Sequence, residues 1–220
     1  MMTLDWNNLK FEYLQTRSFI KYVWNGVCWD DGALITEPYI NLHVDATCLH
    51  YGQSCFEGLK AFHMADEKIR IFRPLLNAKR LQSSCKAVSL EPPPFDLFLE
   101  ALRRVVADNS DFVPPYGSGG SLYIRPFVIG SGVKIGLSPS PETTFMIFVN
   151  PVGNYYAGGI GSPVKALIMH GFDRAAPRGT GNVKVGGNYA PCLRPSLVAR
   201  KKGYTITLFL DAKTGKVYFY

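Results

Sequence analysis

One segment divides this sequence into two parts of unequal length. Residues 150–163 contain four glycines and two prolines without hydrophobic periodicity, which is typical of a connecting segment. About 150 residues precede this segment, enough to bury a sizeable core, whereas fewer than about 60 follow it, near the lower limit for a stable domain. We therefore expect an N-terminal domain at 1–152, a linker at 153–163, and the beginning of a second domain at 164–220.

The N-terminal part combines predicted strands with two amphipathic helices. Residues 122–130 and 144–152 are rich in β-branched and aromatic side chains, which favour strands. Apolar residues at helical spacing predict one helix that begins with Asn77 as its N-cap and a second helix over 96–108. Asn25-Gly26 between aromatic residues predicts a hairpin with a two-residue type I′ turn.

The C-terminal part has a different pattern, in which two apolar strands flank a short helix. Residues 165–170 and 205–210 predict the strands, and Gly203 is a suitable residue just after the helix. Residues 217–220 predict the start of a further strand that ends on three aromatic residues. Such an apolar strand would lack a partner. We therefore expect a chain whose C-terminal domain is truncated.

Composition narrows the class of protein. The net charge is +7, but the densest basic cluster is only Arg200–Lys202, so a small anionic ligand is favoured over nucleic acid. Apolar runs fall short of the roughly 20 residues that span a membrane, and the N-terminus does not resemble a secretory signal. Five irregularly spaced cysteines and four scattered histidines indicate neither a disulfide framework nor a metal site. Reduced thiols predict a cytoplasmic protein.

A glycine-rich stretch carries the strongest chemical signal. Residues 179–191 place Lys184 among four glycines, and Tyr189 follows five residues later. Glycines let another group approach the backbone closely. A desolvated lysine loses its proton readily and can react with a carbonyl group as an amine. The alternative is a solvated lysine on a flexible loop.

Three further features suggest a binding site. Residues 49–62 mix polar and aromatic side chains and would make a poor core strand, because Glu57 would be buried; such a stretch lines a pocket or forms an exposed loop. Arg80 is predicted in the first turn of its helix, where an anion is favoured, although a surface arginine is the commoner case. Arg125, inside a predicted strand, must face solvent, a partner or a ligand.

Four segments together resemble one family. Residues 50–62, 72–81, 122–126 and 174–191 are similar, in this order, to motifs of the branched-chain amino acid aminotransferases, which are pyridoxal-phosphate enzymes of fold type IV. The resemblance implies an α+β, two-domain fold, with a complete small N-terminal α/β domain and a larger C-terminal domain that is cut short.

The resemblance also implies roles for individual residues. Lys184 would bind pyridoxal 5'-phosphate covalently and then move a proton, Tyr189 would hydrogen-bond the cofactor's ring oxygen, and Arg80 would hold its phosphate. A glutamate that pairs with the ring nitrogen would lie beyond Tyr220. The residues implied at the substrate are Tyr51, Phe56, Gly58 and Tyr123 in the pocket, Arg125 at a carboxylate of glutamate or 2-oxoglutarate, and Tyr155 over the side chain.

The implied activity is transfer of an amino group between a branched-chain or other apolar amino acid and 2-oxoglutarate. A role in specialised metabolism is as compatible with the sequence as a role in branched-chain amino acid metabolism. The family usually forms homodimers, so a second copy of the chain is the expected partner. The alternative is a catalytically impaired homologue that survives as a relic or as an interaction protein.

Overall fold

The computed structural model describes residues 4–156 and 161–217, and the chain divides into two compact units, residues 1–160 and 161–220. Residues 157–160 of the predicted linker and residues 218–220 of the predicted last strand lie outside the described residues.

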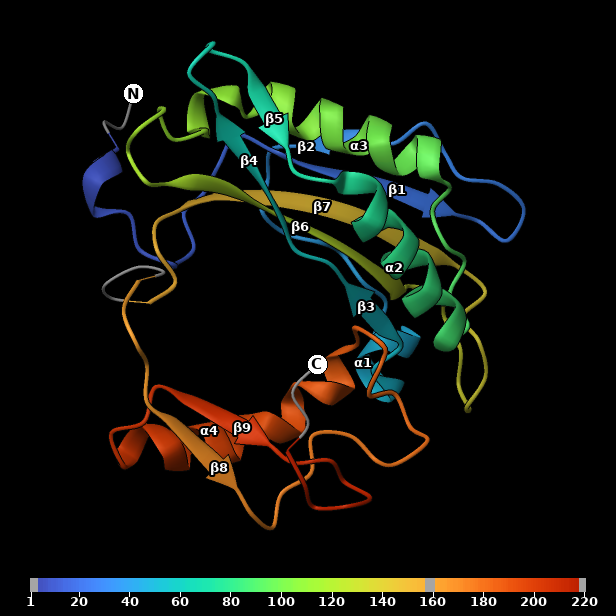
Figure 1. Ribbon diagram of the computed structural model, residues 1–220. Helices are drawn as coiled ribbons and strands as arrows, with labels where there is room; N and C mark the ends of the chain where they lie inside the picture. Colours follow the sequence, from blue (N-terminus) through green and yellow to red (C-terminus); the bar gives the residue numbers. More distant parts are fainter. Residues whose placement is uncertain (1–3, 157–160, 218–220) are drawn as a thin grey trace. The chain divides into compact units, whose positions relative to one another are not determined.

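An antiparallel sheet forms the centre of the first unit (Figure 1). Its order over the described residues is β2-β1-β7-β6-β4-β5, and β3 also pairs with β6. The long strands predicted at 122–130 and 144–152 are confirmed as the central pair, β6 and β7. The strands are β1 (Phe19–Trp24), β2 (Ala33–Ile35), β3 (Ser54–Phe56), β4 (Leu59–His63), β5 (Ile69–Ile71), β6 (Ser121–Gly130) and β7 (Thr143–Val152).

Two helices, α2 (Pro74–Ala87) and α3 (Phe95–Asp108), cover one face of this sheet. Cys55 and Phe145 lie in one row across β3, β6 and β7, because both stand opposite Val128. Cys55 contacts Cys85 of α2, and Phe145 stacks on Phe98 of α3, so both helices pack on the same face. The predicted helix over 96–108 is confirmed, and its apolar side is buried.

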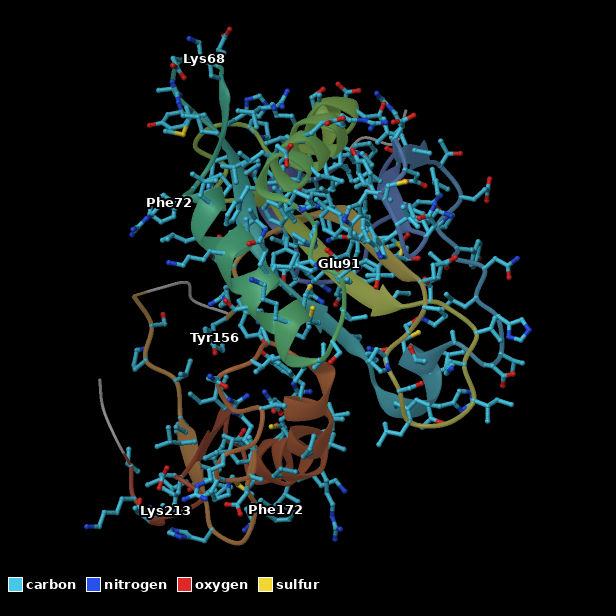
Figure 2. The ribbon with its side chains drawn as sticks, turned by 90° about the vertical axis from the view of Figure 1, so that its right-hand side faces the viewer. Lys68, Phe72, Glu91, Tyr156, Phe172 and Lys213 are labelled. Atoms are coloured by element: carbon cyan, nitrogen blue, oxygen red, sulfur yellow. The ribbon has the colours of Figure 1, made fainter. Side chains whose placement is uncertain are left out.

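The connection between the two helices is held against the sheet. Its residue Glu91, visible in Figure 2, donates its backbone N–H to the Thr143 hydroxyl at the start of β7, 3.4 Å away. The shorter elements of the first unit are the helix α1 (Thr47–Tyr51) and the 3-10 turns η1 (Trp6–Asn8) and η2 (Ser110–Phe112).

The start of α2 differs from the prediction. The helix begins at Pro74, whose fixed φ suits the first helical position, and the residue before it, Arg73, has a φ of 48°. Asn77 is therefore not an N-cap; its side chain donates hydrogen bonds to Glu57 and to the Gly58 carbonyl. Arg80 consequently lies in the second turn, so its predicted placement in the first turn was wrong.

The hairpin after β1 exists, but the predicted turn type was wrong. Gly26 has a φ of 96°, whereas Asn25 does not adopt the positive φ that a type I′ turn requires of both residues. A bridge between Trp24 and Trp29 closes a four-residue loop instead. The Asn25 side chain accepts the backbone N–H groups of Val27 and Cys28 and so replaces the tighter turn.

The strands β3 and β4, which pair one after the other with β6, are separated by an interruption at Glu57. Register is continuous across the gap, since Phe56 pairs with Phe127 and Leu59 with Ile124. Glu57 donates its N–H to the Pro126 carbonyl at 2.7 Å, but proline has no N–H to return, so the ladder breaks there. The prediction that this segment makes a poor core strand was wrong for β3 and β4, because Glu57 between them is fully buried.

The second unit contains two parallel strands joined by a crossover, β8 (Ala166–Met169) and β9 (Ile206–Phe209). The predicted strands and the helix between them are confirmed. Pro195 lies in the first turn of α4 (Leu193–Lys201), where no intrahelical bond to its nitrogen is needed. The 3-10 turns η3 (Gly186–Asn188) and η4 (Ala190–Cys192) precede α4. Within residues 4–156 and 161–217, no helix is long and apolar enough to cross a membrane.

Candidate active site

The glycine-rich stretch of the second unit presents an amine beside a phenol. Lys184 Nζ donates a hydrogen bond to the Tyr189 hydroxyl at 2.9 Å and lies 5.2 Å from the centre of its ring. Lys184 is partly exposed, and Tyr189 is 43% exposed. The next residue, Val185, is buried and anchors the backbone. Both polar groups can therefore meet a ligand while their backbone stays fixed.

A buried amide holds this stretch in shape. Asn188, 1% exposed, donates its side-chain N–H groups to the carbonyls of Thr180 and Val183, at 2.5 and 2.7 Å. Its side-chain oxygen accepts the Thr180 hydroxyl at 2.8 Å. Asn188 directly precedes Tyr189 and Val183 directly precedes Lys184, so the bond between Asn188 and Val183 holds the backbones of the two functional residues together. Sequence reasoning missed this role, because an asparagine between glycine and tyrosine also suits an exposed turn.

In the first unit, Arg80 is joined to a buried carboxylate. Its Nε donates to Oε1 of Glu57 at 2.5 Å, and its Nη2 donates to Oε2 at 2.8 Å. The Arg80 side chain is 55% exposed, whereas that of Glu57 is 0% exposed. Sequence reasoning considered Glu57 only as an obstacle to burial. Arg80 lies 23 residues further along the chain, so no local sequence pattern predicts that it pairs with Glu57.

A second arginine lies on the sheet face opposite the helices. Arg125 donates to the Tyr123 hydroxyl from Nε at 3.1 Å and from Nη2 at 2.8 Å. Its guanidinium carbon is 5.0 Å from the centre of the Phe56 ring, within cation–π distance. Gly58 faces Arg125 across the strands, and a Cβ added there would lie 2.6 Å from the Tyr123 hydroxyl. These four residues therefore form one cluster.

An aromatic contact extends this cluster. The Phe11 ring packs edge-on against Tyr123 and Tyr155, with centroid distances of 5.4 and 5.0 Å. Phe11, Tyr123 and Arg125 line a cavity of about 180 Å³. A larger cavity of about 1110 Å³, lined in part by Gly58 and Lys60, also borders Tyr123. Sequence reasoning did not single out Phe11, which lies in an N-terminal segment without periodicity.

Tyr51 lies apart from the other residues predicted at the substrate. It ends α1 beside the Ile129 end of β6, and its hydroxyl accepts the Gly136 N–H at 3.1 Å. Tyr123 lies six residues from Ile129 along β6, about 20 Å at the usual rise per residue. The first unit therefore brings together Phe56, Gly58, Tyr123, Arg125 and Tyr155, but not Tyr51. Among the described residues, no group of three metal-ligating side chains occurs.

Comparison with known proteins identifies the class to which this fold and these residues belong. The family model described as amino-transferase class IV matches residues 54–215. The chain therefore belongs to the class IV aminotransferase family, and the resemblance found in its motifs is confirmed. The α+β fold of type IV is confirmed as well.

Individual relatives point to one branch of that family. The chain is similar to the branched-chain-amino-acid aminotransferases of Haemophilus influenzae, at 44% identity, and of Helicobacter pylori, at 47% identity, over 97% and 96% of its length. It covers 63% and 62% of these two relatives. The solved branched-chain aminotransferase from Thermoproteus uzoniensis with norvaline matches with a TM-score of 0.70 and 25% identity, over 89% of this chain and 61% of that one. The chain thus spans about three fifths of the proteins that it matches.

Proposed function

We propose that this chain acts as a pyridoxal-phosphate-dependent aminotransferase of the branched-chain type. The observation that carries the proposal is the hydrogen bond between Lys184 Nζ and the Tyr189 hydroxyl, held in place by the buried Asn188. An amine that must react with a carbonyl group and later move a proton needs a polar neighbour that accepts and returns hydrogen bonds.

The polar groups of the chain fit pyridoxal 5'-phosphate, the cofactor that the family uses. The amine of Lys184 suits its aldehyde, the phenol of Tyr189 its ring oxygen, and the guanidinium of Arg80 its phosphate, which planar arginine forks bind well. When bound, the cofactor supplies an electron sink for the bond-breaking step. The role of Lys184 is then to hold the cofactor and to move the proton between the two carbon atoms that exchange it.

The cluster around Arg125 supports a choice of substrate. A guanidinium positioned by Tyr123 can bind the carboxylate of an amino acid or of a dicarboxylate such as 2-oxoglutarate. Phe56, Tyr123 and Tyr155, with Phe11, supply aromatic surface for an apolar side chain. We therefore propose branched-chain or similar apolar amino acids as donors and 2-oxoglutarate as the acceptor. The preferred donor will decide between a general and a specialised metabolic role.

Tyr51 supports a homodimer in this proposal. Its position apart from the Arg125 cluster is explained if it serves the site of a second copy. Near it, Ile135 and Leu137 are 83% and 88% exposed, which is unusual for large apolar side chains unless a partner covers them. The molar mass in solution, measured by light scattering, tests this part of the proposal, and a monomer at micromolar concentration would contradict it.

One experiment tests the cofactor assignment directly. The purified chain is mixed with pyridoxal phosphate, reduced with borohydride and mapped by mass spectrometry. We expect the label on Lys184, its loss in Lys184→Ala, and its retention in the control Lys202→Ala, which removes an exposed lysine of the same unit. Absence of a label in the unmodified chain would instead favour a non-catalytic interaction protein. A screen of amino donors with 2-oxoglutarate tests the substrate class, and preference for a charged donor would contradict it.

A further inference from the structure

Glu57 is a charged residue in a row of the sheet that is otherwise apolar. Side chains alternate between the two faces of a strand, so Cys55, Glu57, Leu59 and Ala61 all point to the face covered by helices. Their exposures are 1%, 0%, 6% and 0%. Burial of a carboxylate is strongly unfavourable unless donors surround it. Its presence in this row therefore indicates a task that an apolar side chain could not perform.

Four N–H donors converge on that carboxylate. Two come from Arg80, at 2.5 and 2.8 Å. Asn77 Nδ2 donates at 2.9 Å, and the backbone N–H of Gly58 donates at 3.2 Å. The two parallel bonds from Arg80 fix the plane of its guanidinium as well as its position. Asn77 and the Gly58 N–H hold the carboxylate itself against rotation.

The pair is asymmetric in its surroundings. Glu57 is fully enclosed, whereas the Arg80 side chain is 55% exposed. The protein interior therefore holds one edge of the guanidinium, while the side chain remains accessible to a ligand. An arginine that must find its orientation on binding loses rotamer entropy, and an arginine that is already oriented loses less.

We propose that Glu57 is a positioning residue that orients Arg80 to bind the phosphate group of the cofactor. This inference rests on the proposed function, which assigns the phosphate to Arg80. Glu57 contributes orientation rather than attraction, because its negative charge opposes that of the phosphate. The next residue, Gly58, faces the opposite side of the sheet, beside Tyr123. Glu57, which holds Arg80, is therefore directly bonded to a residue of the substrate cluster.

The first test compares two ligands that differ only in the phosphate. Glu57→Gln keeps the size of the side chain but replaces one carboxylate oxygen by an amide. We expect it to weaken pyridoxal phosphate about tenfold in a visible-absorbance titration, since one charge-assisted bond is lost, and to weaken pyridoxal less than about twofold. Equal weakening of both ligands, or no change in either, would overturn the inference and leave a purely structural role.

A second variant covers the case in which Glu57→Gln does not fold. Asn77→Ala removes one donor that steadies the carboxylate and leaves the Glu57–Arg80 pair in place. We expect a smaller loss of affinity, about two- to fivefold, again confined to pyridoxal phosphate and absent with pyridoxal. A loss shared by both ligands would contradict the inference here as well.

A third measurement separates this inference from the proposed function. Inorganic phosphate should raise the thermal midpoint of the unmodified chain and of Lys184→Ala alike, but not of Arg80→Lys or Glu57→Gln. In the combined variant, Glu57→Gln should lower the affinity for pyridoxal phosphate by less than about twofold beyond the loss caused by Arg80→Lys, because both substitutions act on the same contact. Stabilisation by phosphate without a lysine adduct would refute the proposed function alone. If the two substitutions lower the affinity additively while Lys184 still forms its adduct, only the role of Glu57 is refuted.

Discussion

Gly58 lies so close to the Tyr123 hydroxyl that a Cβ atom on the glycine would be 2.6 Å from that oxygen. The tyrosine hydroxyl in turn accepts two N–H groups of Arg125. A methyl group at position 58 must therefore displace the ring that supports the arginine. The absence of a side chain at this position is a packing requirement of the cluster, since the φ of Gly58 is not in the left-handed region.

Gly58→Ala should accordingly lower both stability and substrate affinity. We expect a loss of about 1–3 kcal/mol in unfolding free energy from overpacking. In the combined variant Gly58→Ala/Tyr123→Phe, which lacks the obstructing oxygen, the alanine should cost less than it does alone. Denaturant unfolding of the four proteins in the cycle measures the coupling. Additive costs would show that the hydroxyl is not what excludes the methyl group.

Arg125 should affect the acceptor substrate and spare the cofactor. Hydrogen bonds to a charged group contribute about 1.5–3 kcal/mol, so Arg125→Gln should raise the KM for 2-oxoglutarate about 10- to 100-fold. Arg125→Lys should recover only part of this, because lysine keeps the charge but loses the planar fork. Steady-state kinetics measure the KM, and the borohydride label on Lys184 should persist in both variants. Loss of that label would place Arg125 in the cofactor site instead.

Asn188 should control the geometry of the lysine stretch. Asn188→Ala leaves the carbonyls of Thr180 and Val183 without their side-chain donor, and each unsatisfied buried group costs about 1–3 kcal/mol. We expect a lower thermal midpoint and a slower reaction of Lys184 with pyridoxal phosphate. Asn182→Ala, an exposed asparagine of the same stretch, is the matched control and should change neither. A normal reaction rate in Asn188→Ala would show that the amide only stabilises the unit.

The sequence predicted the elements whose own composition or spacing of apolar residues determines their structure. The strands β6 and β7 were predicted from their β-branched and aromatic content, and both are largely buried in the structure. The helix α3 was predicted from its apolar period, and the residues of that period are its buried ones. The start of α2 was missed, since Asn77 and Pro74 are both plausible first residues of a helix. In the structure the Asn77 side chain instead donates to Glu57, a residue outside the helix, and local sequence does not reveal that contact.

The candidate site was predictable only where the motif itself contains the partners. Lys184 and Tyr189 lie five residues apart, and their hydrogen bond could be anticipated from one stretch. The burial of Glu57 could not, because a carboxylate is buried only where distant donors meet it, and local sequence does not reveal them. The separation of Tyr51 from Tyr123 likewise depends on the register of β3 along β6, which no motif encodes.

The cysteines provide a chemical test of burial. The Sγ atoms of Cys55 and Cys85 lie 3.4 Å apart, and both residues are buried. The hydrogen bond between the Cys85 and Cys55 thiols, together with burial, raises the pKa of the Cys85 thiol far above its usual range, so the reactive thiolate is not available at neutral pH. A thiol reagent should therefore modify the exposed Cys28 first and the buried pair only after denaturation.

A matched variant makes the cysteine test decisive. Cys28→Ser should abolish the fastest phase of modification and leave the denaturation-dependent phase unchanged. Mass spectrometry of the labelled peptides assigns each phase to its cysteine. Rapid labelling of Cys85 in the folded chain would contradict the packing of β3 against α2.

The hairpin between β4 and β5, which carries Lys68 at its tip (Figure 2), should give the chain a pH-dependent contribution to stability. Arg70 donates two hydrogen bonds to Asp66, at 2.6 and 2.7 Å, and they lower the pKa of this carboxyl from 3.8 to about 2. A depressed pKa in the folded state means that the contribution is complete above about pH 4 and is lost as the pH falls toward 2.

Asp66→Asn should thus be less stable than the unmodified chain at neutral pH, by a small and salt-sensitive margin because both side chains are exposed. The margin should vanish near pH 2, and it should be absent at every pH in an Arg70→Gln background. Denaturant midpoints across this range measure it, and a margin that persists at pH 2 would mean that Asp66 stabilises the turn by other contacts, such as its bond to the Lys68 N–H.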